Sequence, residues 1–211
     1  AGPYKNIVRW RPMTWEVDGE TYLHERAIST QQTGFSFVTQ SRSWLPNAIG
    51  GVIWFGVDDT YSTVYVPMYA GMTEVPETFA VGNGSIMEFS DNAAFWVFNQ
   101  VSNLAYTRYK DMIVDIQKVQ DELELGFIEE VKGIDVAASE IYKTNPELAV
   151  SFITDYSVTQ ANNTVYTWKK LYAHLFTKFL DGNVKEALPV PSNHKYIPPK
   201  VKFPGYSEEW Y

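Results

Sequence analysis

Residues 42–71, RSWLPNAIGGVIWFGVDDTYSTVYVPMYAG, place the strongest constraint on the fold of this chain. They contain two apolar runs, Gly51–Val57 and Thr63–Tyr69, in which β-branched and aromatic residues predominate. Such residues suit a pleated, largely buried surface. The runs are joined by the polar residues 58–62, and so short a connection favours an antiparallel hairpin.

Three further segments show the alternation of apolar and polar residues that is typical of strands. Met13–Val17 and Glu20–His24 flank Asp18-Gly19, a dipeptide suited to a tight hairpin turn. Phe35–Ser41 alternates in the same way and is a predicted strand. Residues 72–90 contain several turn residues, so we expect a loop there with one short strand at its edge.

The pattern changes to helical spacing near Asp91, which is the predicted N-cap of a first long helix. From Phe95 to Val119, apolar residues recur at three- and four-residue steps and define one face of an amphipathic helix. Gly126 and Gly133 are predicted breaks or bends in front of a further helical segment.

A second helical region is predicted to begin at Asn145-Pro146, because proline is well tolerated at the first helical position. We expect two segments there, Leu148–Tyr156 and Thr159–Leu180, ending at Asp181-Gly182 with glycine as the C-cap. From Leu188 onward, prolines recur and exclude a regular helix, so an extended strap on the protein surface is predicted.

Together these patterns predict an α+β fold in which antiparallel strands are followed by a helical layer. The expected parts are a sheet-forming region at 1–90, a helical region at 91–187 and a Pro-rich extended tail at 188–211. The 16% aromatic content indicates a folded chain. The net charge of -8 argues against a nucleic-acid partner, and no run is apolar enough to cross a membrane. The sequence assigns no compartment.

Residues 42–71 and the stretch EVPETFAVGNGSIMEFSDNAAFWVFNQVSNLAYTRYKDMI resemble the C-terminal portion of the dipeptidases of peptidase family C69. The resemblance extends from about residue 25 to about residue 185. It implies an N-terminal-nucleophile hydrolase, in which helices pack on two stacked antiparallel sheets in an αββα sandwich. It also implies hydrolysis of dipeptides through thiol attack and an acyl-enzyme, with no metal or organic cofactor.

That chemistry needs a cysteine at the mature N-terminus, and this chain contains no cysteine. Ala1 offers an α-amine without a side-chain nucleophile. The resemblance therefore implies that the nucleophile lies upstream, in an N-terminal part of the same protein that would be this portion's partner. Residues 1–211 alone are expected to be inactive as a peptidase.

The candidate site residues are Gln40 and Arg42, at the end of the strand predicted over Phe35–Ser41. Polar groups at a strand end can orient a substrate or donate to an oxyanion. Arg42 can bind the carboxylate of a dipeptide through two parallel hydrogen bonds. The alternative is that Arg42 pairs with Asp58 or Asp59 and only fixes the hairpin.

No metal site is predicted. Asp58-Asp59 provides only two carboxylates, and aspartates are common in turns for local backbone reasons. His24-Glu25 does not continue into a zinc-binding helix motif, and His174 and His194 lie far from it in sequence.

Other patterns carry no specific chemistry. Residues 82–85 read as a turn without a phosphate-binding motif, and Ser41 and Ser43 lack the context of a serine nucleophile. A non-catalytic binding or interaction module with an aromatic surface is the alternative function. A homo-oligomer, most simply a dimer, is also expected, with the helical region or an uncovered sheet face at the contact. The helical region is rich in large apolar residues: Trp96, Phe127, Phe152, Trp168, Leu175 and Phe179.

Overall fold

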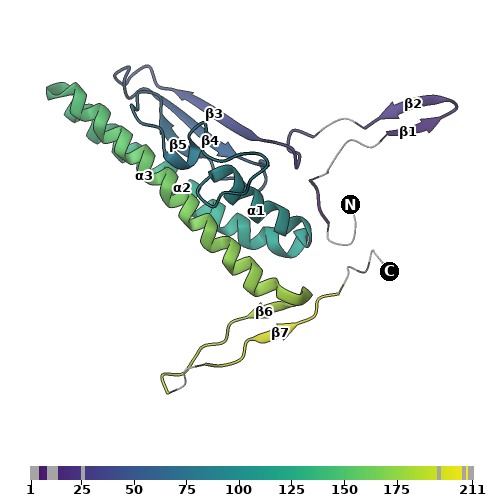
Figure 1. Ribbon diagram of the computed structural model, residues 1–211. Helices are drawn as coiled ribbons and strands as arrows, with labels where there is room; N and C mark the ends of the chain where they lie inside the picture. The colour runs from purple at the N-terminus through teal and green to yellow at the C-terminus, as the bar shows by residue number, and fades with distance from the viewer. Residues whose placement is uncertain (1–4, 9–13, 25–26, 194–195, 206–207, 209–211) are drawn as a thin grey trace.

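The computed structural model describes residues 5–8, 14–24, 27–193, 196–205 and 208, and it confirms the α+β prediction. A small antiparallel sheet lies on a helical layer, and one hairpin projects from each end of the chain (Figure 1). The predicted positions Ala1, Met13, Glu25 and His194 lie outside the described residues.

The sheet consists of β3 (Phe35–Ser41), β4 (Gly51–Val57) and β5 (Val66–Tyr69), in that order, with both neighbouring pairs antiparallel. The predicted hairpin is therefore confirmed. Its second strand begins at Val66 and not at Thr63, because helix side chains bind the backbone before it. Gln120 donates to the Thr63 carbonyl oxygen at 2.7 Å, and the Tyr65 N–H donates to Glu124 at 3.0 Å.

Three helices follow: α1 (Ala94–Tyr106), α2 (Tyr109–Thr144) and α3 (Pro146–Phe179). The prediction of Asp91 as the first N-cap is wrong, since Ala93 occupies that position and no side chain caps the helix. The stripe predicted as one helix is interrupted at Arg108, whose φ of -155° and ψ of 55° are not helical. Asn145-Pro146 starts α3 as predicted, and the Asn145 side chain accepts a hydrogen bond from the Leu148 N–H.

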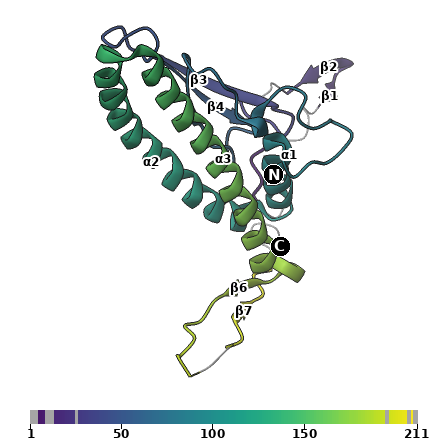
Figure 2. The ribbon, with the colours of Figure 1, turned by 60° about the vertical axis from the view of Figure 1, so that its left-hand side comes forward.

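The predicted breaks at Gly126 and Gly133 are wrong, because α2 runs through both glycines without interruption. A glycine inside a helix costs only about 1 kcal/mol, and α2 packs along α3 over much of its length (Figure 2). The predicted division of α3 is also absent. Thr154 and Ser157 donate to the carbonyl oxygens four residues earlier, so their hydroxyls are satisfied within the helix.

The helix end and the following loops differ in detail from the predictions. After Phe179 the chain forms a short 3-10 turn, η2 (Leu180–Gly182), and the predicted glycine, Gly182, with a φ of +74°, is its last residue. Between the sheet and α1, residues 72–90 contain another 3-10 turn, η1 (Glu77–Phe79), and an isolated Ser85–Glu88 bridge in place of the predicted short strand.

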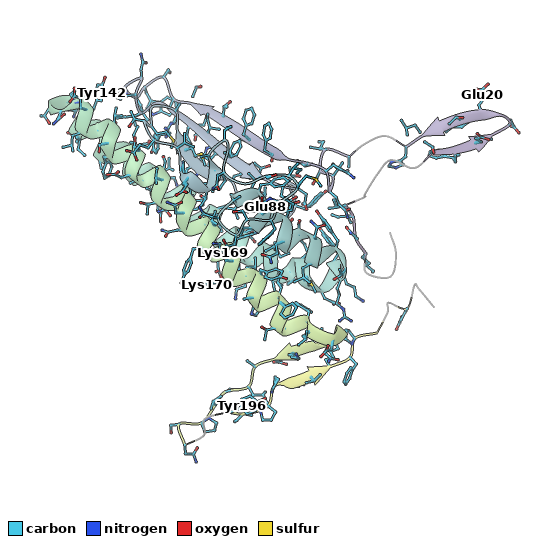
Figure 3. The ribbon with its side chains drawn as sticks, in the orientation of Figure 1. Glu20, Glu88, Tyr142, Lys169, Lys170 and Tyr196 are labelled. Atoms are coloured by element: carbon cyan, nitrogen blue, oxygen red, sulfur yellow. The ribbon has the colours of Figure 1, made fainter. Side chains whose placement is uncertain are left out.

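Two hairpins extend away from the body. β1 (Thr14–Val17) pairs with β2 (Glu20–Leu23) through the predicted Asp18-Gly19 turn, and Glu20 lies near its tip (Figure 3). Within the predicted extended strap, β7 (Lys200–Lys202) pairs with β6 (Val184–Glu186) in a hairpin that leaves the end of α3.

The core lies between the helices and one face of the sheet. Phe98 of α1 and Trp168 of α3 stack at 4.7 Å between ring centroids, and both are fully buried. On the sheet, Val52 and Tyr69 pack with Val131 of α2 and Ile153 of α3. No helix in the described part of the chain has the length and apolar composition of a membrane span.

Candidate functional site

Arg42 follows the last residue of β3 and is buried, with 5% of its surface exposed. Its backbone N–H donates to the Gly50 carbonyl oxygen at 2.8 Å, which continues the β3–β4 ladder by one position. Gly50 has to be a glycine, because a Cβ there would lie 2.9 Å from the Arg42 carbonyl oxygen. The chain therefore folds tightly around Arg42.

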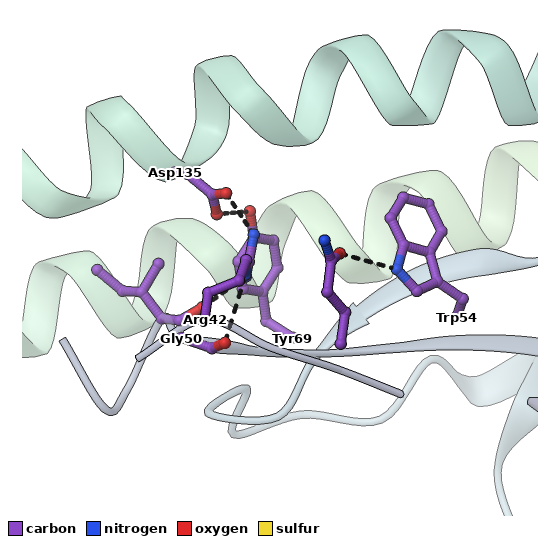
Figure 4. A network of polar contacts seen from close by, with 7 residues as sticks. Arg42, Gly50, Trp54, Tyr69 and Asp135 are labelled. Atoms are coloured by element: carbon purple, nitrogen blue, oxygen red, sulfur yellow. Dashed lines mark hydrogen bonds and ion pairs between the residues drawn. The ribbon is translucent and has the colours of Figure 1, made fainter. Parts of the chain in front are cut away.

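Three protein groups accept hydrogen bonds from the Arg42 guanidinium. Nε and Nη2 donate to the carbonyl oxygens of Gly50 and Ile49, at 3.3 and 2.8 Å. Nη1 donates to the carboxylate of Asp135, which lies on α2 (Figure 4). A buried guanidinium with a carboxylate and two carbonyl partners is well compensated for its loss of hydration.

Tyr69 of β5 completes this polar network (Figure 4). Its hydroxyl donates to Asp135 at 2.7 Å, and the Arg42 guanidinium carbon lies 5.6 Å from the centre of its ring. Burial and the adjacent Asp135 carboxylate raise the pKa of the Tyr69 hydroxyl well above its ordinary value. The network therefore joins a strand end, a second strand and a helix.

The acid that pairs with Arg42 is not one of those suggested by the sequence. Asp58 follows the opposite end of β4, where its N–H donates to the Gly34 carbonyl oxygen. A seven-residue strand is roughly 20 Å long, so Asp58 and Asp59 cannot reach Arg42. Asp135 and Tyr69 were missed by sequence reasoning. Asp135 is 93 residues from Arg42, and the alternation within a strand cannot identify a partner on a distant helix.

Gln40 lies two residues before Arg42, and its side-chain oxygen accepts a hydrogen bond from Trp54 Nε1 at 3.2 Å (Figure 4). Both residues line a cleft of about 920 Å³ between the β3–β4 strands and α2. Arg42 and Asp135 also border this cleft, with Trp44 at its rim. The structure thus brings both predicted site residues to one cleft.

Asp59 has the structural role that was predicted for turn aspartates. One carboxylate oxygen accepts from the backbone N–H groups of Tyr61 and Ser62, at 2.9 and 3.1 Å. The other accepts from the Ser62 hydroxyl at 2.8 Å and from the Tyr106 hydroxyl of α1. Asp59 therefore ties the turn after β4 to the first helix.

Asp58 is buried as well, but one of its carboxylate oxygens has no hydrogen-bond partner among the described residues. Burial, with a smaller contribution from the neighbouring Asp59 charge, raises the pKa of Asp58 to about 7. Its φ of +72° is in the left-handed region, which aspartate tolerates better than most residues.

The histidines lie apart. His24 follows β2 on the projecting hairpin, whereas His174 lies on α3, with its Nε2 3.7 Å from Asp115 of α2. Among the described residues, no three His, Cys, Asp or Glu side chains are placed to hold a metal ion.

The family model described as "Peptidase family C69" matches residues 6–122, which include the sheet, α1 and the first part of α2. No curated protein matches the chain.

Proposed function

The chain belongs to peptidase family C69 and accordingly has a peptidase function, and we propose that it forms the C-terminal part of a cysteine-type dipeptidase whose nucleophile lies outside residues 1–211. The absence of cysteine from the chain supports the second half of this proposal. A thiolate must then come from another part of the enzyme.

The observation that carries the proposal is the exposed aromatic part of one sheet face, along β3. Cross-strand partners share a face, so the register places Phe35, Phe37, Ile53 and Phe55 on the side opposite Tyr69. Phe35 and Phe37 are 60% and 55% exposed. Phe35 stacks on Phe55 with 5.8 Å between their centroids, which forms an aromatic surface.

Such a surface suits a second sheet. Stacked sheets bury apolar inner faces about 10 Å apart. On this face Phe35 and Phe37 of β3 are exposed, whereas Val57 and Val66 toward β5 are buried against the helices. One sheet with one helical layer corresponds to half of the αββα sandwich that the family resemblance implies. We infer that the nucleophile-bearing part supplies the second sheet and packs on Phe35 and Phe37.

Within this proposal, Gln40 and Arg42 support the substrate site. The Arg42 guanidinium is engaged by Asp135 and two carbonyl oxygens, so its role is to position the end of β3. Trp54 holds the carbonyl side of the Gln40 amide, which leaves the NH2 group as the donor for a substrate carboxylate or oxyanion.

The test compares residues 1–211 with the complete encoded polypeptide on a panel of dipeptides. We expect hydrolysis only by the complete form, and loss of hydrolysis when its first cysteine is replaced by alanine. Comparable turnover by residues 1–211 would show that the nucleophile lies within them. An upstream reading frame without a suitable cysteine would also reject the proposal.

A separate measurement tests Gln40. In the complete peptidase, Gln40→Ala should lower kcat/KM about tenfold or more, since one hydrogen bond of about 1.4 kcal/mol corresponds to that factor. Lys132→Ala, at the rim of the same cleft, is the matched control and should leave kcat/KM unchanged. Equal effects of both substitutions would remove Gln40 from the substrate site.

The cleft beside Trp44 and Trp54 also favours a second candidate, a non-catalytic binding module. That function predicts that residues 1–211 bind a small ligand without turnover. A rise in Tm of the isolated chain with a dipeptide, and no hydrolysis by the complete polypeptide, would favour the binding module over the peptidase.

A further inference from the structure

Strand β3 is an edge of its sheet, and its backbone groups alternate in direction. The residue pairs 42–50 and 34–58 are hydrogen-bonded across β3 and β4. Hydrogen-bonded and non-bonded pairs alternate in an antiparallel ladder, so Ser36, Val38 and Gln40 bond to β4. The N–H and C=O groups of the residues between them point away from the sheet: Phe35, Phe37, Thr39 and Ser41.

In the part of the chain that the structure describes, this edge has none of the usual protection against pairing with another strand. Edges are commonly blocked by lysine, proline, a bulge or a covering segment. The β3 sequence, FSFVTQS, contains no charged residue and no proline, and its register with β4 runs without a bulge. Val38, at its centre, is 58% exposed.

We propose that β3 pairs with β3 of a second copy of this chain, antiparallel about a two-fold axis at Val38. This register places Phe37 opposite Thr39 and Phe35 opposite Ser41 of the second copy. The outward-pointing backbone groups of each strand then meet those of the other. These outward-pointing groups can form hydrogen bonds only in this register or in one shifted by an even number of residues. A shift by one residue would place them opposite groups that already bond to β4.

The occupant is a second copy because the strand is complementary to itself. A two-fold interface joins the same surface on both subunits and closes without leaving a free patch. Self-pairing of FSFVTQS opposes no like charges, although each chain carries a net charge of -8 elsewhere. The association should therefore strengthen with added salt, which screens the repulsion between the bodies. The proposal does not depend on the peptidase function.

The two-fold register makes a sharp prediction for single-cysteine variants, since the chain has no cysteine of its own. Val38 would face its own copy in a non-hydrogen-bonded pair, with Cα atoms about 4.5 Å apart, within disulfide range. Val38→Cys should form a disulfide-linked dimer under mild oxidation. Phe37→Cys is the matched control, because its counterpart lies two positions along the strand, beyond about 7 Å. Equal or slower crosslinking of Val38→Cys would overturn the proposal.

A second measurement uses the backbone. Thr39→Pro removes an outward N–H without touching the ladder to β4, whereas Thr39→Ala keeps that N–H. In sedimentation velocity, the unmodified chain and Thr39→Ala should dimerise with rising concentration, and Thr39→Pro should weaken the dimer at least tenfold. A chain that stays monomeric at all concentrations would reject the proposal.

Hydrogen exchange distinguishes the competing occupant. In the proposed dimer, protection of the Phe37, Thr39 and Ser41 amides increases with protein concentration. Protection that is independent of concentration would assign the edge to a strand within the same polypeptide and overturn the pairing of two copies.

Discussion

The two faces of the β3–β4–β5 sheet differ in how far their side chains are buried. On the helix-covered face, Val52 and Tyr69 are buried, and Arg42 beside them is bonded to a carboxylate and two carbonyl oxygens. On the opposite face, Phe35 and Phe37 remain more than half exposed.

This difference indicates which face of the sheet another protein segment would contact. A sheet that is polar on its open face needs no further partner, whereas an aromatic open face marks an interaction surface. The helical region buries most of the residues from which association was predicted, although Leu125, Tyr166 and Phe176 on α2 and α3 are at least half exposed. Four of the six large residues on which that expectation rested are buried within the chain: Phe127, Trp168, Leu175 and Phe179.

The largest expected effect is on the covered face. Arg42→Ala should destabilise the chain by about 3–5 kcal/mol, because it leaves the Asp135 carboxylate without its cation in a largely buried site. Urea unfolding measures the change. Lys132→Ala, which removes an exposed ion pair to Glu129 on the same helix, is the control and should cost no more than about 0.5 kcal/mol. A loss below about 1 kcal/mol for Arg42→Ala would contradict the account of a completed, buried network.

Neighbouring residues of β4 provide the next comparison, since they point to opposite faces. Val52→Ala should cost about 2 kcal/mol, because Val52 is 1% exposed and packs against both long helices. Ile53→Ala removes more carbon atoms but should cost less, since Ile53 lies on the open face. The reverse order in denaturant unfolding would show that the open face is already packed within the chain.

How far the sequence predicted this arrangement depends on the range of the interactions. Alternation predicted β3, a run of β-branched and aromatic residues predicted β4, and Asn145-Pro146 marked the start of α3, because these signals lie within a few residues. Gly126 and Gly133 misled the prediction, because their low helix propensity is outweighed by packing of α2 on α3. Family resemblance directed attention to Gln40 and Arg42, but their partners Trp54 and Asp135 emerged only from the tertiary fold.

A pH-dependent effect concerns Asp58, a buried group that lacks full compensation. Its folded pKa of about 7 lies above the ordinary value of 3.8, so the folded chain holds a proton that the unfolded chain releases between these values. The free energy of unfolding should therefore fall as pH rises from about 4 to 7, by up to about 1.4 kcal/mol per pH unit.

Asp58→Asn should remove this pH dependence, because the amide does not titrate and asparagine tolerates the positive φ. Guanidinium unfolding at several pH values, with Asp91→Asn as an exposed control, measures the difference. Parallel pH profiles for Asp58→Asn and the unmodified chain would mean that Asp58 is ionised in the folded state throughout this range.

The smallest change in stability is expected for Phe37→Ser on the open face. Surface substitutions of this kind usually change the free energy of unfolding by no more than about 0.5 kcal/mol. The loss of an exposed aromatic ring should nevertheless reduce the binding of a hydrophobic dye such as ANS, which reports exposed apolar surface. Stability that is nearly unchanged together with weaker dye binding is the behaviour of an interaction surface that none of the described residues covers. A cost above about 1 kcal/mol would instead mean that the ring is packed within the chain. The proposed place for a second sheet would then be occupied already.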